Sequence, residues 1–514
     1  MIMKKYIVLI LTLSCVLWSN LGLAQNPNRQ KQNQTPTELE TMVPIGDGFV
    51  LILLNDLERP SKMALRYFND AEEVLGEKTI DLKRQGLLTQ FEGAFEFNGQ
   101  LCVMTSLYYP GPQRNHLLFQ RFSLPDFEPL NSEVIDEAFS PEFFRVPFGF
   151  AKSPNEEYIS FYSWTYTLPE DPAKVSVRVY NKEMEEVWTE RYLLPFKNET
   201  LYIFDHAVND AGRSFLFCEN YNGNPGRYID EEKIDYFILA AEQGNKNLIE
   251  YKLNLPNYTM TGLRTRMDTS GAIVGGAFLR DTKKKSRIGG LYLFNIPADG
   301  KSIERNQIGL SQEMYEAAYP YGDKEPYFNA NRHKLTDFAV DHIFVEPDNS
   351  WIITSEYRKE IPNSYEIEFN DIVVMKVPST RDRLTWIRRI PKRQTALQGD
   401  WGQYSYKAIQ KKGNVFFFFN DTVKNHNQEG DPKVVDGYEG GRAQVLLMQI
   451  NSAGEIFKND LTEIARKKRI ETIWPARIWE IKGKSKVMIY GDLPVQVGFG
   501  GGVFFNFGWG PDLY

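Results

Sequence analysis

The chain has 514 residues, of which 42% are hydrophobic and 14% aromatic, so it can bury a large core. Its formal net charge of −7 argues against nucleic acid or an anionic membrane as the main partner. It has three cysteines, Cys15, Cys102 and Cys218, and no CxxC pair, which excludes a thiolate zinc site.

The first 24 residues have the three parts of a secretory signal: Lys4 and Lys5, an apolar stretch from Ile7 to Trp18, and a small-residue cleavage site ending at Ala24. We therefore expect an extracytoplasmic protein (periplasmic, cell-surface or secreted, as in a bacterial envelope) with no membrane span. Residues 25–38 are polar and are expected to be a disordered lead-in, followed by a single domain over 39–514. Cys102 and Cys218 lie inside apolar runs and are expected to be buried free thiols.

Eight short turns each open onto a β-rich apolar run, as repeat proteins do. The turns carry Gly48, Gly99, Asn155, Gly212, Gly271, Asn349, Gly413 and Gly483, and the runs after them include FVLILLN, WIITSEY and VFFFFND. A second β-run follows each first run, and outer strands such as VLGEKTIDL and EVWTERYLL come next. A further candidate strand precedes each turn, so the repeating unit is four strands joined by tight hairpins.

These repeated four-stranded units resemble the β-propeller superfamily across residues 39–514, and no WD, kelch or sialidase signature points to one family within it. The resemblance implies an all-β propeller of antiparallel blades, because radial closure removes exposed sheet edges. Eight turns favour eight blades, with the segment before Met42 able to supply a missing last strand. Seven blades, with the two ends sharing one blade, is the alternative. The basic runs 283–287 and 466–469 are expected in solvated hairpins or loops.

The long connections should gather on one rim. In a four-stranded meander the second-to-third loops and the interblade connections share one end of the blade. In this chain they include 106–115, 163–173, 219–234, 311–334, 355–369 and 420–442. Rigid scaffolds usually carry their function on such loops.

The rim loops supply the predicted ligand-binding residues, which are aromatic, basic or amide- and acid-bearing. Aromatics with a polar tip suit sugar stacking or protein anchoring, and arginine suits carboxylates. The residues are Tyr108, Tyr109, Arg114, Trp164, Tyr166, Tyr221, Arg227, Tyr357, Arg358, Asn420, Asp421, Tyr438 and Arg442. For each one alone, ordinary loop packing is an alternative explanation.

One position per blade, seven residues after each turn, is expected near the loop-bearing end of the second strand. These positions are Asn55, Ser106, Tyr162, Glu219, Phe278, Glu356, Asn420 and Tyr490. Two carboxylates across a cleft are what glycoside hydrolysis needs, so Glu219 and Glu356 are the candidate catalytic pair if the protein is an enzyme. A structural role, with both acids paired to loop arginines or lining a solvated channel, is the alternative.

The five histidines are scattered, and no GxSxG, HExxH or EF-hand pattern occurs, so we expect no metal and no cofactor. The sequence favours a non-catalytic binding or scaffold propeller that recognises a protein or a glycan through its long-loop rim. A carbohydrate-active hydrolase or lyase is the second hypothesis, and a structural component of an envelope assembly is the third.

Overall fold

In the computed structural model, residues 38–492 are described. The exceptions are 57–59, 70, 72, 85, 141–145, 166, 224–232, 282–287, 311–337, 362–363, 398–401, 426–436, 441–442, 468–469 and 481–486. The expected signal, the polar lead-in and the basic run 283–287 lie outside the described residues. The chain divides into two compact units that meet in the sequence between Leu253 and Asn254.

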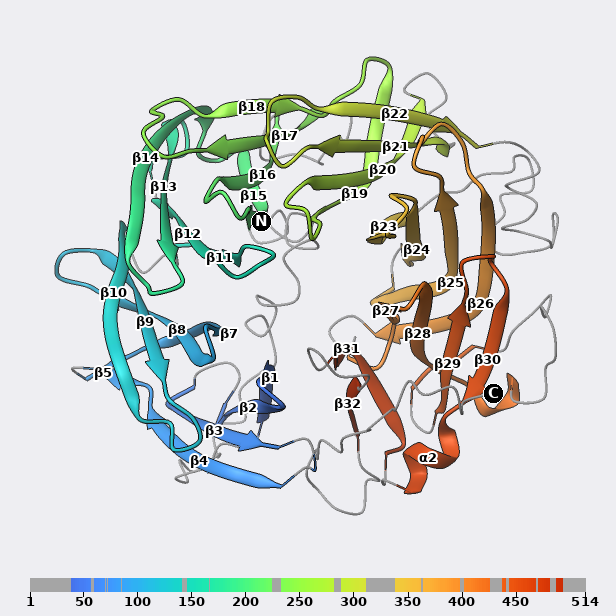
Figure 1. The fold of residues 1–514 in the computed structure, drawn as a ribbon, viewed down its shortest axis with the longest axis horizontal. Helices are drawn as coiled ribbons and strands as arrows, with labels where there is room; N and C mark the ends of the chain where they lie inside the picture. The colour runs from blue at the N-terminus through green and yellow to red at the C-terminus, as the bar shows by residue number, and fades with distance from the viewer. Residues whose placement is uncertain are drawn as a thin grey trace. The chain divides into compact units, whose positions relative to one another are not determined.

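The N-terminal unit contains four sheets, each an antiparallel meander of four consecutive strands (Figure 1). Blade 1 holds β1 (Glu38–Ile45), β2 (Gly48–Leu54), β3 (Lys62–Phe68) and β4 (Val74–Asp81). Blade 2 holds β7 (Gln90–Phe97), β8 (Gln100–Tyr109), β9 (Arg114–Phe122) and β10 (Pro129–Phe139), after a small hairpin of β5 (Lys83–Arg84) and β6 (Leu87–Leu88). Blade 3 holds β11 (Phe148–Lys152), β12 (Tyr158–Thr165), β13 (Pro172–Asn181) and β14 (Glu186–Lys197). Blade 4 holds β15 (Leu201–Val208), β16 (Ser214–Tyr221), β17 (Ile234–Ala241) and β18 (Ile249–Lys252).

The C-terminal unit contains three more four-stranded meanders and a two-stranded sheet. Blade 5 holds β19 (Tyr258–Met267), β20 (Ile273–Asp281), β21 (Ile288–Ile296) and β22 (Glu304–Gly309). Blade 6 holds β23 (Phe338–Val345), β24 (Trp351–Glu360), β25 (Glu366–Val377) and β26 (Trp386–Leu397). Blade 7 holds β27 (Lys407–Lys411), β28 (Asn414–Asp421), β29 (Gln444–Ile450) and β30 (Ile456–Asp460), with a 3-10 turn, η5 (Val423–Asn425). Blade 8 is described as β31 (Thr472–Glu480) and β32 (Val487–Asp492).

The blade topology confirms the all-β propeller fold and the preference for eight blades. Blade 1 is complete from one contiguous segment, and β1 is its first strand, paired with β2. Residues Glu38–Thr41 therefore belong to blade 1 and do not complete blade 8. Seven of the eight expected turns join the first two strands of a blade, and the eighth, at Gly483, lies outside the described residues.

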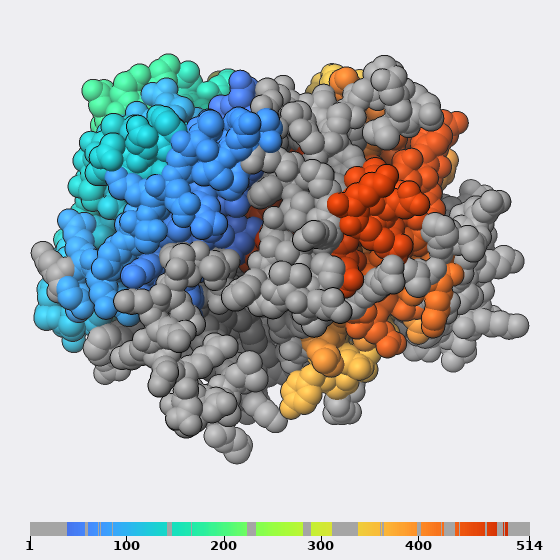
Figure 2. Space-filling view, turned by 90° about the horizontal axis from the view of Figure 1, so that it is seen from below, coloured from blue at the N-terminus to red at the C-terminus, as the bar shows by residue number. Residues whose placement is uncertain are grey.

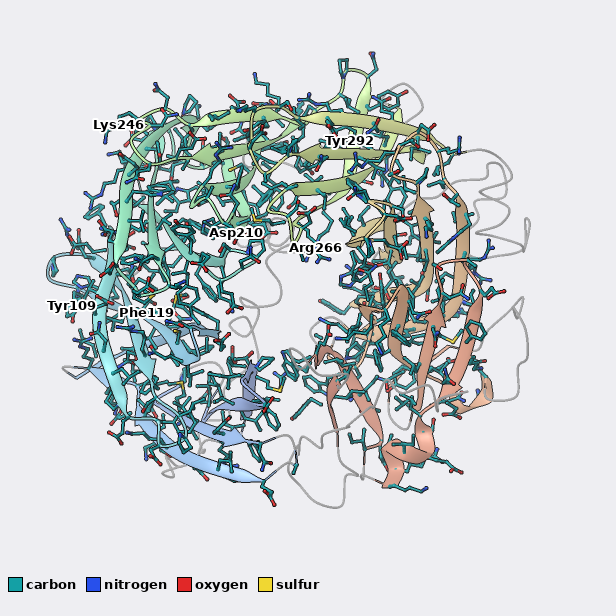
Figure 3. All side chains as sticks on the ribbon, viewed as in Figure 1. Tyr109, Phe119, Asp210, Lys246, Arg266 and Tyr292 are labelled. Atoms are coloured by element: carbon teal, nitrogen blue, oxygen red, sulfur yellow. The ribbon has the colours of Figure 1, made fainter. Side chains whose placement is uncertain are left out.

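The core lies between successive blades, because the middle strands of each sheet are apolar on both faces. Burial patterns such as BBBBBBB along β2 show this directly. Blades 1 and 2 share one apolar cluster that includes Ile52 and Val103. Figure 2 shows the outer surfaces of these two blades, coloured from blue to cyan, next to each other. Phe119, on blade 2, packs edge-on against Phe161 of blade 3 at a centroid distance of 5.8 Å (Figure 3).

The same pattern holds in the C-terminal unit, where blades 5 and 6 share one cluster and blades 6 and 7 another. Polar contacts also cross between blades. Arg266 of β19, labelled in Figure 3, donates to the backbone oxygen of Ile343 in β23 at 3.0 Å. A single meander cannot bury both of its faces alone, and such buried contacts between neighbouring sheets hold it in place.

Cys102 and Cys218 are buried and unbridged, as expected. The loop expected around residues 466–469 is wrong for its first half, because Arg466 and Lys467 are the exposed end of a short helix, α2 (Thr462–Lys467). The helix has fewer than two turns, too short to produce a detectable 3.6-residue period. No helix among the described residues is long and apolar enough to cross a membrane.

Candidate functional site

In the N-terminal unit, a pocket of about 430 Å³ opens between blades 2 and 3, at the end of the blades that carries the long second-to-third loops. Five strands contribute: β9 and β10 of blade 2, and β12, β13 and β14 of blade 3. The lining residues are Arg114, Glu137, Phe139, Thr165, Lys174, Val175, Ser176, Arg191, Tyr192 and Leu193. The pocket is large enough for a small ligand.

Strand register explains how these side chains meet. Arg114 lies directly opposite Phe139 across the β9–β10 pair. Across β13 and β14, Ser176 lies opposite Arg191 and Lys174 lies opposite Leu193. Directly opposite residues in an antiparallel pair point to the same face of the sheet, and so do residues two apart along a strand. The four blade 3 side chains therefore share one face: they are Lys174, Ser176, Arg191 and Leu193.

The predicted binding residue Arg114 lines this pocket and forms an ion pair with Glu137. Glu137 also lies 3.6 Å from Nε2 of His116, which stacks at a tilt against Tyr109 with ring centroids 4.6 Å apart. Burial lowers the pKa of His116, more than Glu137 raises it. Figure 3 shows Tyr109 toward the outside of blade 2.

A buried acid of blade 2, Asp136, also joins blades 2 and 3. Asp136, 3% exposed, accepts a hydrogen bond from the Ser163 hydroxyl and forms an ion pair with Arg178 at 3.1 Å.

Glu219, a candidate catalytic acid, lies near the end of β16 in the same unit. Among the described residues its side chain has no hydrogen-bond or ion-pair partner. Burial raises the pKa of this carboxyl to about 7. At neutral pH, a carboxylic acid with a pKa near 7 can act as a general acid or base. An ordinary surface glutamate is ionised at this pH and has no proton to donate.

In the C-terminal unit, the second candidate acid, Glu356 on β24, is fully buried inside a polar network. Its Oε1 lies 2.6 Å from Nζ of Lys392, and its Oε2 accepts hydrogen bonds from Arg358 Nε at 2.8 Å and Ser405 Oγ at 2.6 Å. Burial alone would raise the pKa of Glu356, but the positive charges of Lys392 and Arg358 outweigh burial and hold it below its usual value.

Arg358 bridges two carboxylates of this network. Its Nη2 lies 2.8 Å from Asp341 Oδ1, and Tyr406 donates to the other Asp341 oxygen at 2.8 Å. Burial raises the pKa of Asp341 to about 6, although Arg358 opposes the shift. The network therefore uses the fork of Arg358 to hold two acids of this chain, as arginine holds carboxylates generally.

Three predicted binding residues of the loop 420–442 are also buried: Asn420, Asp421 and Tyr438. Asn420 donates to the backbone oxygens of Gln403 and Ile473 and accepts from the Ile473 amide, so it joins blade 7 to blade 8. Asp421 accepts from Asn425, also buried, at 2.8 Å. Tyr438, 2% exposed, forms a parallel bridge with Gln394 of β26.

The structure thus separates the predicted ligand-binding residues by exposure. Arg114 and Arg358 are exposed, and Tyr108, Tyr109, Trp164 and Tyr221 are half-buried. Tyr357, Asn420, Asp421 and Tyr438 are buried, and Tyr166, Arg227 and Arg442 lie outside the described residues. Ligand binding by any of them stays a prediction.

Sequence reasoning missed Lys174, Ser176 and Arg191 in the pocket and Lys392 in the network. Lys174, Arg191 and Lys392 lie on third or fourth strands, where a basic residue in an alternating run is typical of a solvated face. Lys392 is buried with its Nζ against Glu356, the backbone oxygen of Phe369 and Gln394, and the contact with Glu356 joins strands that are far apart in the sequence.

Among the described residues, no three His, Cys, Asp or Glu side chains gather as metal ligands would. No family model matches the chain, and no curated protein matches it. Among solved structures, it is similar to the polysaccharide lyase Uly1, at 9% identity over 85% of this chain and 94% of that one, with a TM-score of 0.36. It is also similar to the β-propeller domain of the Trilobed protease from Pyrococcus furiosus, at 12% identity over 84% and 97% of the two chains, with a TM-score of 0.35. A third similar structure is the WD40 domain of SCAP from fission yeast, at 8% identity over 88% and 90%, with a TM-score of 0.38.

Proposed function

We propose that the protein works outside the cytoplasm as a non-catalytic binding propeller, which recognises a protein or a glycan through the long-loop end of its blades. The observation that carries the proposal is the pocket between blades 2 and 3, at the blade end where binding was predicted and lined by the predicted residue Arg114. The location rests on the signal-like first 24 residues.

The closed network around Glu356 supports binding over catalysis. Both oxygens of this carboxylate are engaged by cations or a hydroxyl, and the side chain is inaccessible to a substrate. A lowered pKa keeps it ionised, so it cannot serve as a proton donor near neutral pH.

The experiment compares two point variants of the mature protein in capture assays with glycan arrays and envelope extracts. Tyr109→Ala alters the loop-bearing end of blade 2. Lys182→Gln alters an exposed lysine, paired with Glu157, at the opposite, short-turn end of blade 3. Capture that weakens in Tyr109→Ala and persists in Lys182→Gln supports the proposal. Equal capture by both variants contradicts the assignment of this rim, and recovery of the native protein from the cytoplasm contradicts the location.

The second candidate function, a hydrolase or lyase acting on glycans, is favoured by the burial of Glu219 near the end of β16, which raises the pKa of this carboxyl to about 7. It predicts that purified protein shortens some acidic or neutral polysaccharide and that Glu219→Gln abolishes this turnover. Turnover that survives in Glu219→Gln rules out this acid.

A further inference from the structure

We propose that the pocket between blades 2 and 3 binds a carboxylated sugar unit, a uronate, of an acidic glycan. This inference rests on the proposed binding function and names the ligand class of the same site. It follows from three parts of the pocket lining that match three chemical parts of a uronate ring: its carboxylate, its hydroxyl groups and its apolar C–H face.

The first part is cationic. Arg114 is neutralised by Glu137, but Lys174 and Arg191 are exposed and form no ion pair with any described residue. Both line the pocket, on neighbouring strands of blade 3. Two uncompensated cations on one face of a concave site attract a carboxylate, and an arginine can hold it with two parallel hydrogen bonds.

The second part is a buried hydroxyl. Ser176 is 5% exposed, and no described residue forms a hydrogen bond with its Oγ. Leaving a buried hydroxyl unsatisfied has a free-energy cost, which a ligand hydroxyl would remove by pairing with it. Ser176 is a neighbour of both cations, since it lies opposite Arg191 and two residues from Lys174. Thr165, opposite Lys174, adds a second hydroxyl on this face.

The third part is apolar. Phe139 is 44% exposed and Leu193 is 63% exposed, and both line the pocket. An aromatic ring suits the C–H face of a sugar. A glutamate or aspartate side chain of an acidic peptide would satisfy the cations only, whereas a uronate ring carries the carboxylate, the hydroxyls and the apolar face together.

The test is calorimetric titration of the mature protein with oligomers of galacturonate, mannuronate and glucuronate. Their neutral methyl esters and tetraglutamate serve as comparison ligands. We expect one uronate oligomer to bind and its methyl ester to bind at least about tenfold more weakly, with affinity falling as salt rises. Lys174→Gln and Arg191→Gln should each weaken binding about tenfold, as expected for a lost hydrogen bond to a charged group.

Two further variants separate a binding role from a structural one. Ser176→Ala should weaken binding about threefold while leaving the melting temperature unchanged or higher, because it removes a hydroxyl that forms no hydrogen bond with any described residue. Lys182→Gln, which removes the same charge as Lys174→Gln from the opposite end of blade 3, should bind like the native protein.

The proposal is overturned if no uronate oligomer binds a folded protein, or if binding is indifferent to Lys174, Ser176 and Arg191. Tetraglutamate binding that depends on the same residues would overturn the glycan assignment and leave the proposed binding function standing. If Tyr109→Ala also leaves every captured partner unaffected, the proposed function fails as well.

Discussion

Replacing Lys392 with methionine should destabilise the C-terminal unit strongly, because this ammonium group is completely buried and fully engaged. Its Nζ lies 2.6 Å from Glu356 Oε1 and donates to Phe369 O at 2.8 Å and to Gln394 Oε1 at 2.9 Å. Methionine fills a similar volume, so the effect of Lys392→Met reports the lost charge and hydrogen bonds more than a cavity.

The expected loss of stability follows from the contacts that Glu356 keeps in the variant. Glu356 keeps Arg358 and Ser405 on Oε2, but Oε1 is left buried without a partner. Removing one member of a buried ion pair typically costs about 3–5 kcal/mol. For a cooperative unit of roughly 200 residues, this loss corresponds to a fall in melting temperature on the order of 10 °C.

The assay is urea and thermal unfolding followed by circular dichroism, with Lys359→Met, an exposed lysine of the same blade, as the matched control. The double variant Glu356→Gln/Lys392→Met should recover about 1–3 kcal/mol relative to the sum of the single variants, because it no longer buries an unpaired charge. A loss below about 1 kcal/mol for Lys392→Met, or strictly additive effects, would refute the reasoning.

Three further predictions concern the other unit. Burial raises the pKa of Glu219 to about 7, so the folded state binds more protons than the unfolded chain between about pH 4.5 and 7. The free energy of unfolding should therefore fall as pH rises through that window. At pH 8, Glu219→Gln should raise this free energy, measured by urea unfolding, by about 1–3 kcal/mol. The same dependence of stability on pH in the variant and the native protein would contradict this. Burial raises the pKa of Cys102 to about 12 and that of Cys218 well above its usual value, so neither thiol should react with iodoacetamide in the folded protein, as mass spectrometry before and after unfolding can check. A Cβ at Gly76 would lie 2.0 Å from a backbone oxygen of the next blade, so Gly76→Ala should cost about 1–3 kcal/mol while Gly111→Ala, in open space, should cost little; equal melting temperatures would show that the blades separate easily at this point.

The repeat could be predicted from the sequence because its signals are local. An apolar run after Gly48 or Asn349 encodes a strand within about ten residues, and the turn residue encodes the hairpin. Asn349 adopts the positive φ of 61° that such a turn requires, as does Gly212 at 72°. The fold class, the eight blade units and the buried thiols therefore followed from the order of residues alone.

The site was predictable only in part. The sequence indicated the loop-bearing end of the blades, where the pocket lies, and it singled out Arg114. It also placed Glu356 correctly on the second strand of its blade, but it gave no sign that Lys392, on the fourth strand, would neutralise it. Glu356 and Asn420 occupy equivalent positions in the repeat but have different partners: Glu356 pairs with Lys392 of its own blade, and Asn420 pairs with the backbone of Ile473 in the next blade.

What the sequence by itself determined is the series of antiparallel meanders, since hydrophobic alternation and turn residues act over short stretches of chain. What only the tertiary structure decided is which polar side chains are buried and paired, as at Glu356 and Asn420, and which remain available, as at Lys174 and Arg191. Burial depends on contacts between strands that are distant in the sequence. A charged residue that is typical of a solvated face in its own strand is therefore buried and paired when a neighbouring segment excludes water from it.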